Sequence, residues 1–138
     1  MATIDAAAAA NRSFTKAIAD IAADPESVIT PDEAKNKDTT PDQIISRFVD
    51  TAYDMGTDYA ATVETAIARH PRAFGDHLAF ALFGIGAGFF ESVEFADPGT
   101  DAPADTLKAV ADRAGFTGDA KVVDREDGTV RVHPAYRN

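Results

Sequence analysis

Most of the chain places apolar residues three and four positions apart, the spacing of amphipathic helices, and one segment departs from this pattern. Residues 78–90, LAFALFGIGAGFF, contain no polar side chain. Such a segment is too short to cross a bilayer, which needs about 20 apolar residues. His77 and Glu91 bound it, so we expect a helix that is buried within protein and runs from about residue 72 to residue 95.

Three glycines, Gly84, Gly86 and Gly88, interrupt this apolar segment. Inside a helix each costs roughly 1 kcal/mol relative to alanine. Gly84 and Gly88 are one turn apart and share a face, so we expect that face to admit a second helix at short distance, from the same chain or from another copy. The candidate residues of this helix–helix interface are Gly84, Gly88, Leu78, Phe80, Phe83 and Phe90. The segment lacks a complete phosphate-binding motif and no strand precedes it, which favours packing over phosphate binding.

Three further helices are predicted from periodicity and capping signals. The first runs from Ile4 to about Ala23, with an apolar stripe of Phe14, Ile18 and Ile21. A long helix is expected from Asp42 to Arg69, bent at Gly56. A short amphipathic helix spans residues 103–114, and Gly115 follows it in the position of a C-terminal cap.

The connection between the first two helices, residues 24–40, is polar and carries two related motifs. Thr30-Pro31-Asp32-Glu33 and, ten residues later, Thr40-Pro-Asp-Gln43 each place threonine before proline and an acceptor three residues on. This is the pattern of a capping box. We expect the first motif to start a single turn and the second to start the long helix.

The C-terminal region predicts a β-hairpin over residues 120–134. Asp127-Gly128 is a strong signal for a two-residue turn between strands. Such a turn pairs Asp124 with Arg131 and Val123 with Val132, which places opposite charges and branched side chains across from each other. The short tail that follows is expected to be anchored by Tyr136.

These elements predict one mainly α domain over residues 1–138. About four helices pack around the central apolar helix at residues 72–95, and the small hairpin closes one side. The N-terminal helix occupies residues 1–23, with an N-terminal half rich in alanine, and the helical core occupies residues 41–116.

Charge and composition narrow the classes of function. The net charge is −10 with no cluster of basic residues, which disfavours nucleic acid and anionic membranes as partners. Aspartate dominates the acidic residues, a composition typical of proteins from halophiles and also favoured by GC-rich genomes. There is no cysteine, and the N-terminus has no secretory signal, so we expect a location in the cytoplasm or within an assembled particle.

Candidate chemistry is sparse along the chain. His70 and His77 are separated by Pro71 and lack the spacing of a metal site on one helix. Glu91 and Glu94 follow the apolar segment without a neighbouring nucleophile. We therefore expect no enzyme activity, no catalytic or metal-binding residues and no cofactor.

Three hypotheses for function follow. The first is a non-enzymatic interaction protein, either a homo-oligomer or an accessory structural subunit of a larger complex such as a virion. The second is a DNA-binding regulator, because helix 103–114 followed by hairpin 121–133 resembles the last third of a winged-helix domain. The third is a small bundle that binds an apolar ligand among Phe80, Phe83, Phe90 and Met55.

Overall fold

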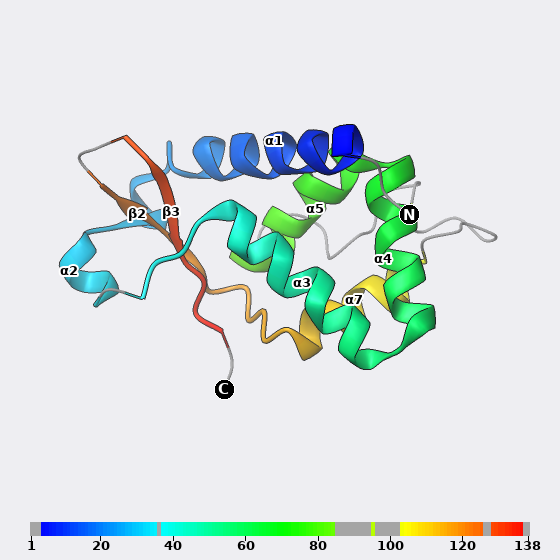
Figure 1. The fold of residues 1–138 in the computed structure, drawn as a ribbon. Coiled ribbons are helices and arrows are strands. Elements are labelled where there is room, and N and C mark those ends of the chain that lie inside the picture. Colours follow the sequence, from blue (N-terminus) through cyan, green and yellow to red (C-terminus); the bar gives the residue numbers. More distant parts are fainter. Residues whose placement is uncertain (1–3, 36, 85–94, 96–102, 126–127, 137–138) are drawn as a thin grey trace.

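The computed structural model describes residues 4–35, 37–84, 95, 103–125 and 128–136, and over these the protein is mainly helical with a small sheet near its C-terminus (Figure 1). This confirms the predicted fold class. The helices are α1 (Ile4–Ile21), a 3₁₀ turn (Pro25–Ser27), α2 (Pro31–Ala34), α3 (Pro41–Met55), α4 (Thr57–Arg69), α5 (Pro71–Phe83) and α7 (Ala104–Arg113). The strands are β1 (Val28–Ile29), β2 (Lys121–Asp124) and β3 (Val130–His133).

Helix α1 lies along α5 at one side of the molecule (Figure 1). The two backbones come close together at Gly75. A Cβ atom at Gly75 would lie 2.5 Å from the carbonyl oxygen of Ala10 and 2.7 Å from the backbone nitrogen of Phe14. Only glycine permits this separation. The contact brings the apolar stripe of α1 into the core, where Phe14 and Ile18 are fully buried as predicted.

The apolar helix α5 ends at Phe83, which corrects the prediction that it continues through the glycines to residue 95. Gly84 adopts a left-handed conformation (φ 70°) and its N–H donates to the carbonyl of Phe80, as in glycine C-caps. A Cβ at Gly84 would lie 2.5 Å from the carbonyl oxygen of Gly118. The close approach expected at Gly84 therefore exists, but its neighbour is a loop of the same chain. Residues 85–94, which include Gly88 and Phe90, lie outside the described residues.

The predicted long helix over residues 42–69 is two helices, α3 and α4, so the expectation of a continuous bent helix is wrong. Gly56 lies between them with φ 139°, a conformation that interrupts the helix rather than bending it. Its N–H still donates to Ala52 and its carbonyl still accepts from Ala60. The break allows the two apolar stripes to face the same core, with Phe48 on α3 and Val63 on α4 both buried.

Aromatic side chains connect the helices within this core. The ring of Phe48 meets Phe74 of α5 edge-on at 5.6 Å and Phe116 at 5.9 Å. Phe116 follows the predicted cap at Gly115 and stacks on Tyr136 at 6.0 Å. Arg47 of α3 makes a cation–π contact with the Tyr136 ring, with its guanidinium 3.8 Å from the ring centroid. Tyr136 thus holds the C-terminal tail against α3, as expected.

Both predicted capping boxes are present. The Thr30 hydroxyl accepts from the Glu33 N–H while the Glu33 carboxylate accepts from the Thr30 N–H, and Thr40 and Gln43 make the same exchange. The first box starts the single turn α2, and Lys35 ends it in the left-handed conformation. The second starts α3. These two caps therefore determine where the polar connection becomes helical.

The sheet has three strands in the order β1-β2-β3 and lies at one end of the helical body (Figure 1). Strand β1 comes from the connection predicted to be polar, where no strand was expected, and pairs in parallel with β2. In the hairpin, Val122 pairs with Val132 and Val123 with Arg131, one residue away from the predicted register. The observed register places Val122 and Val132 on the same buried face, and Thr39 forms an additional bridge to Val132.

We expect Gly75→Ala to destabilise the protein by about 1–3 kcal/mol, because a methyl group there overlaps the backbone of α1. At an exposed helical position, replacing glycine by alanine normally stabilises by about 0.4–1 kcal/mol. Urea denaturation of the variant and the parent chain measures the sign of the change. A raised denaturation midpoint would show that the two helices can separate without cost.

A second prediction concerns the hairpin turn. Gly128 has φ 79° and open space around the position of a Cβ atom, so substitution acts through the backbone conformation alone. We expect Gly128→Ala to cost about 1–2 kcal/mol, and Gly128→Asn to cost less because asparagine tolerates this conformation. Thermal melts of both variants measure which substitution lowers the stability more. Equal losses would contradict the conformational explanation.

Candidate interaction site

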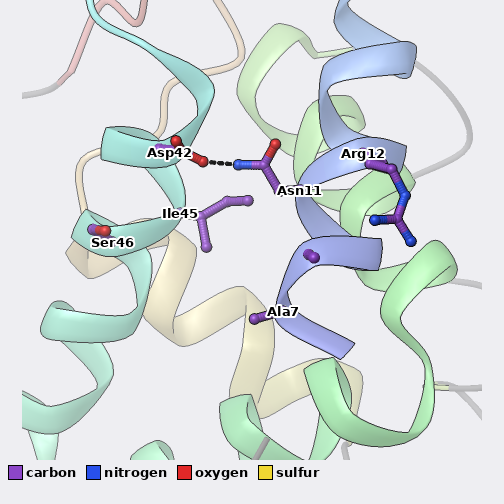
Figure 2. Close-up of a pocket in the computed structure, with 7 residues that line it drawn as sticks. Ala7, Asn11, Arg12, Asp42, Ile45 and Ser46 are labelled. Atoms are coloured by element: carbon purple, nitrogen blue, oxygen red, sulfur yellow. Dashed lines mark hydrogen bonds between the residues drawn. The ribbon is translucent and has the colours of Figure 1, made fainter. Parts of the chain in front are cut away.

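A surface groove separates the N-terminal half of α1 from the first turns of α3 (Figure 2). Its volume is about 580 Å³ and its lining is mainly apolar. The lining residues are Ala7, Ala8, Asn11 and Arg12 of α1 and Asp42, Ile45 and Ser46 of α3. Three other grooves over the described residues are smaller, with volumes of about 400, 350 and 310 Å³.

The alanine-rich start of α1 forms one wall of this groove. Alanine favours the helix but offers little side chain to pack. Of the described alanines in the run, Ala10 is buried against α5, whereas Ala7 and Ala8 are exposed. The wall is therefore a helix surface without bulk, which a neighbouring chain could approach closely.

The opposite wall is positioned by the capping box of α3. Thr40 starts the helix, so Asp42 falls in its first turn, where a carboxylate is stabilised by the helix dipole. The Asn11 amide donates a hydrogen bond to the Asp42 carboxylate across the groove (Figure 2). Thr15 in turn donates to the Asn11 side-chain oxygen at 3.2 Å. The Asn11 side chain therefore links the two walls of the groove.

A separate acidic surface covers the end of α3 and the start of α4. Asp50, Asp54 and Asp58 are exposed. Tyr53 lies among them with 54% of its surface exposed. Its hydroxyl donates to the Glu64 carboxylate of α4, and this hydrogen bond raises the pKa of Tyr53. The acidic surface is therefore solvated, with one aromatic ring at its centre.

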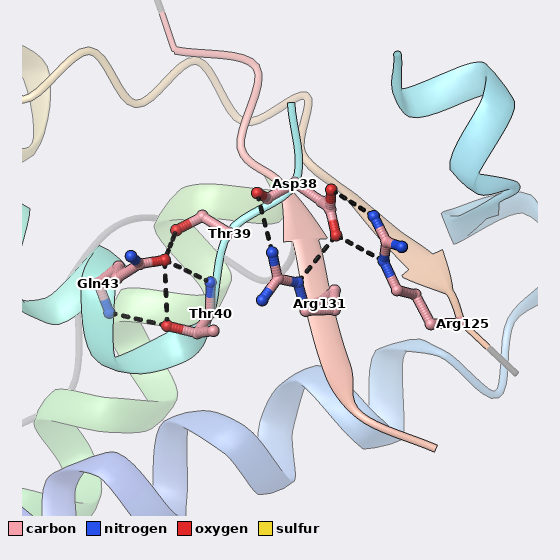
Figure 3. Close-up of polar contacts among 6 residues, drawn as sticks. All are labelled: Asp38, Thr39, Thr40, Gln43, Arg125 and Arg131. Carbon is pink, nitrogen blue, oxygen red and sulfur yellow. Dashed lines mark hydrogen bonds and ion pairs between the residues drawn. The ribbon is translucent and has the colours of Figure 1, made fainter. Parts of the chain in front are cut away.

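The hairpin carries a buried charge cluster around Asp38 (Figure 3). Arg125 donates to both oxygens of the Asp38 carboxylate at 2.8 Å, and Arg131 donates to one of them at 2.8 Å. Only 3% of the Asp38 side chain is exposed. The hydrogen bonds from Arg125 hold the pKa of Asp38 well below its usual range, with help from Arg131 and against the opposing effect of burial. A carboxylate so strongly engaged ties the polar connection to the sheet.

His70 and His77 both lie near Phe95. The His70 ring is 5.9 Å from Phe95 and the His77 ring is 5.7 Å from it, both edge-on. His70 also joins α4 to α5, as the final cap of one and the first cap of the other. Within the described ranges, no three His, Cys, Asp or Glu side chains are grouped so that they could hold a metal ion. The contacts that are seen are packing contacts.

The residues predicted for a helix–helix interface are not brought together on one surface by the described structure. Leu78 and Phe83 are buried in the core of the chain itself. Phe80 is half-buried beside Lys16 and Asp20, in a groove of about 310 Å³ between α1 and α5. Glu91 and Glu94, like Gly88 and Phe90, lie outside the described residues. That interface therefore stays a prediction.

Sequence reasoning did not identify the α1–α3 groove, because its two walls are more than thirty residues apart in sequence. The signals that could have indicated it are local. They are the exposed alanines of α1, which no apolar stripe uses, and the half-buried Ile45 beside the predicted cap at Thr40. Neither signal says which helix lies opposite. Of the helices that the structure describes, none is long and apolar enough to cross a membrane.

We expect Asp38→Asn to lower the free energy of unfolding by about 1–3 kcal/mol at neutral pH, because two arginines lose their charged partner. The folded-state pKa of Asp38 lies below the unfolded value, so its stabilisation is complete above about pH 4 and is lost as pH falls below it. The variant should therefore lose less stability than the parent on acidification. Urea melts at several pH values measure both slopes, with the exposed Asp50→Asn as control. Parallel slopes for Asp38→Asn and the parent chain would contradict this role.

Comparison of the chain with protein-family models, with curated proteins and with solved structures finds no match in any of the three.

Proposed function

We propose that this chain is a non-enzymatic helical interaction protein that assembles with itself, or serves as an accessory structural subunit of a larger complex such as a virion. The observation that carries the proposal is the apolar groove between α1 and α3, with its exposed alanine wall. Small side chains on an exposed helix let a partner's backbone approach closely, so that dispersion contacts can accumulate. A wide, open groove of this kind suits a protein surface.

The charged side chains favour this function over DNA binding. A winged-helix domain needs basic groups on its recognition helix and hairpin. Helix α7 carries Asp105 and Asp112 against only Lys108 and Arg113. In the hairpin, Arg125 and Arg131 are both engaged by Asp38, so much of their charge is neutralised within the fold. Duplex DNA is therefore the less favoured partner.

The oligomeric state of the purified protein tests the proposal. We expect a mass above that of one chain, rising with protein concentration, because the groove presents apolar surface for association. Screening of the net charge of −10 should strengthen association as salt increases. Light scattering and sedimentation at several protein and salt concentrations measure this. A strict monomer throughout would overturn self-assembly and leave only the role of an accessory subunit, and salt-sensitive binding to duplex DNA would favour the DNA-binding alternative.

A further inference from the structure

We propose that a second copy of the same chain occupies the α1–α3 groove, in a two-fold symmetric contact. This inference rests on the proposed function and names its partner and its surface. In a two-fold contact both copies use the same surface patch. A residue on the α1 wall of one copy then contacts the α3 wall of its partner, and the symmetric contact forms between the partner's α1 wall and the first copy's α3 wall. The patch must therefore be complementary to itself.

The charges at the margins of the groove meet this requirement. Arg12 is exposed on α1 and Asp42 is exposed on the first turn of α3, and they lie on opposite sides of the groove with Asn11 between them (Figure 2). A two-fold axis through the groove would bring each Arg12 to the partner's Asp42. The Asn11 hydrogen bond uses Oδ1 of Asp42.

The apolar part of the groove fits the same partner. Ala7 and Ala8 are exposed and Ile45 is half-buried between the charged margins. A helix whose surface is alanine can approach another such helix closely, and each copy would cover the other's Ile45. The charged margins would then surround an apolar centre, the usual arrangement of an interface core and rim.

The overall charge explains why this surface is favoured over others for self-association. Two chains of net charge −10 repel each other. A symmetric contact through Asp50, Asp54 and Asp58 would place carboxylates against carboxylates. At the α1–α3 groove Arg12 on one wall and Asp42 on the other carry opposite charges, so this surface offers local attraction where the acidic surface offers repulsion.

Charge reversal in both directions tests the contact. Arg12→Asp and Asp42→Arg each place like charges opposite each other at two symmetric positions, and we expect each to weaken self-association by about tenfold or more. In an equal mixture of the two variants, opposite charges face each other again at both positions. The mixture should therefore recover association close to that of the parent chain, measured by sedimentation equilibrium at physiological salt.

Matched controls separate the contact from effects on folding or net charge. Asp32 follows Thr30-Pro31 in α2 as Asp42 follows Thr40-Pro41 in α3, so Asp32→Arg is the matched control for Asp42→Arg. Arg72→Asp reverses an exposed charge on α5 and is the control for Arg12→Asp. Both control variants should leave association unchanged. Ala8→Glu adds bulk and charge to the wall while keeping a good helix former, and should also weaken association. Circular dichroism confirms that each variant is folded.

Each outcome decides a different point. If the parent chain forms an oligomer and neither Arg12→Asp nor Ala8→Glu weakens its self-association, the groove is not the interface, and the proposed function still stands. Single variants that weaken association without recovery in the mixture would overturn the two-fold pairing of Arg12 with Asp42. A parent chain that is monomeric under all conditions would overturn both this inference and self-assembly as the proposed function.

Discussion

The contact between α1 and α5 at Gly75 is the constraint on which the rest of the structure depends. Because no side chain separates the two backbones, α1 lies low enough for Phe14 and Ile18 to enter the core. That position also determines which surface of α1 remains outside. Ala10 faces α5, and the exposed alanines face the start of α3. The proposed interaction groove is therefore a consequence of the closest helix contact.

Electrostatics plays two distinct roles in this acidic protein. Inside the fold, Asp38 gathers two arginines and joins the polar connection to the hairpin. On the surface, the exposed Asp50, Asp54 and Asp58 of α3 and α4 are solvated and disfavour contact with a second copy. The proposed self-association therefore uses a surface where a cation and a carboxylate lie at opposite margins. The proposed two-fold contact follows from that arrangement of charges.

Glycine contributes to the architecture at positions of three different kinds. Gly75 permits close helix packing, Gly56 breaks a helix in two, and Gly84 ends α5 against Gly118. Gly84 was expected to lie inside a helix, where glycine costs stability relative to alanine, and to permit close packing there. The cost is absent at Gly84 because the helix stops there. Gly75 lies outside the thirteen-residue run, and periodicity alone gave no reason to single it out.

The sequence by itself determined the elements whose causes are local. Two capping boxes place the starts of α2 and α3, apolar stripes define the buried faces of α1 and α3, and Asp127-Gly128 indicates a hairpin. Tertiary structure decided what depends on contacts between distant segments. The register of β3 follows from burial of Val132 and its bridge to Thr39, and β1 exists because β2 lies beside it. The groove also depends on contacts between distant segments, because its shape comes from the packing of α1 onto α5 and onto α3. No local sequence pattern encodes the distance between two helices.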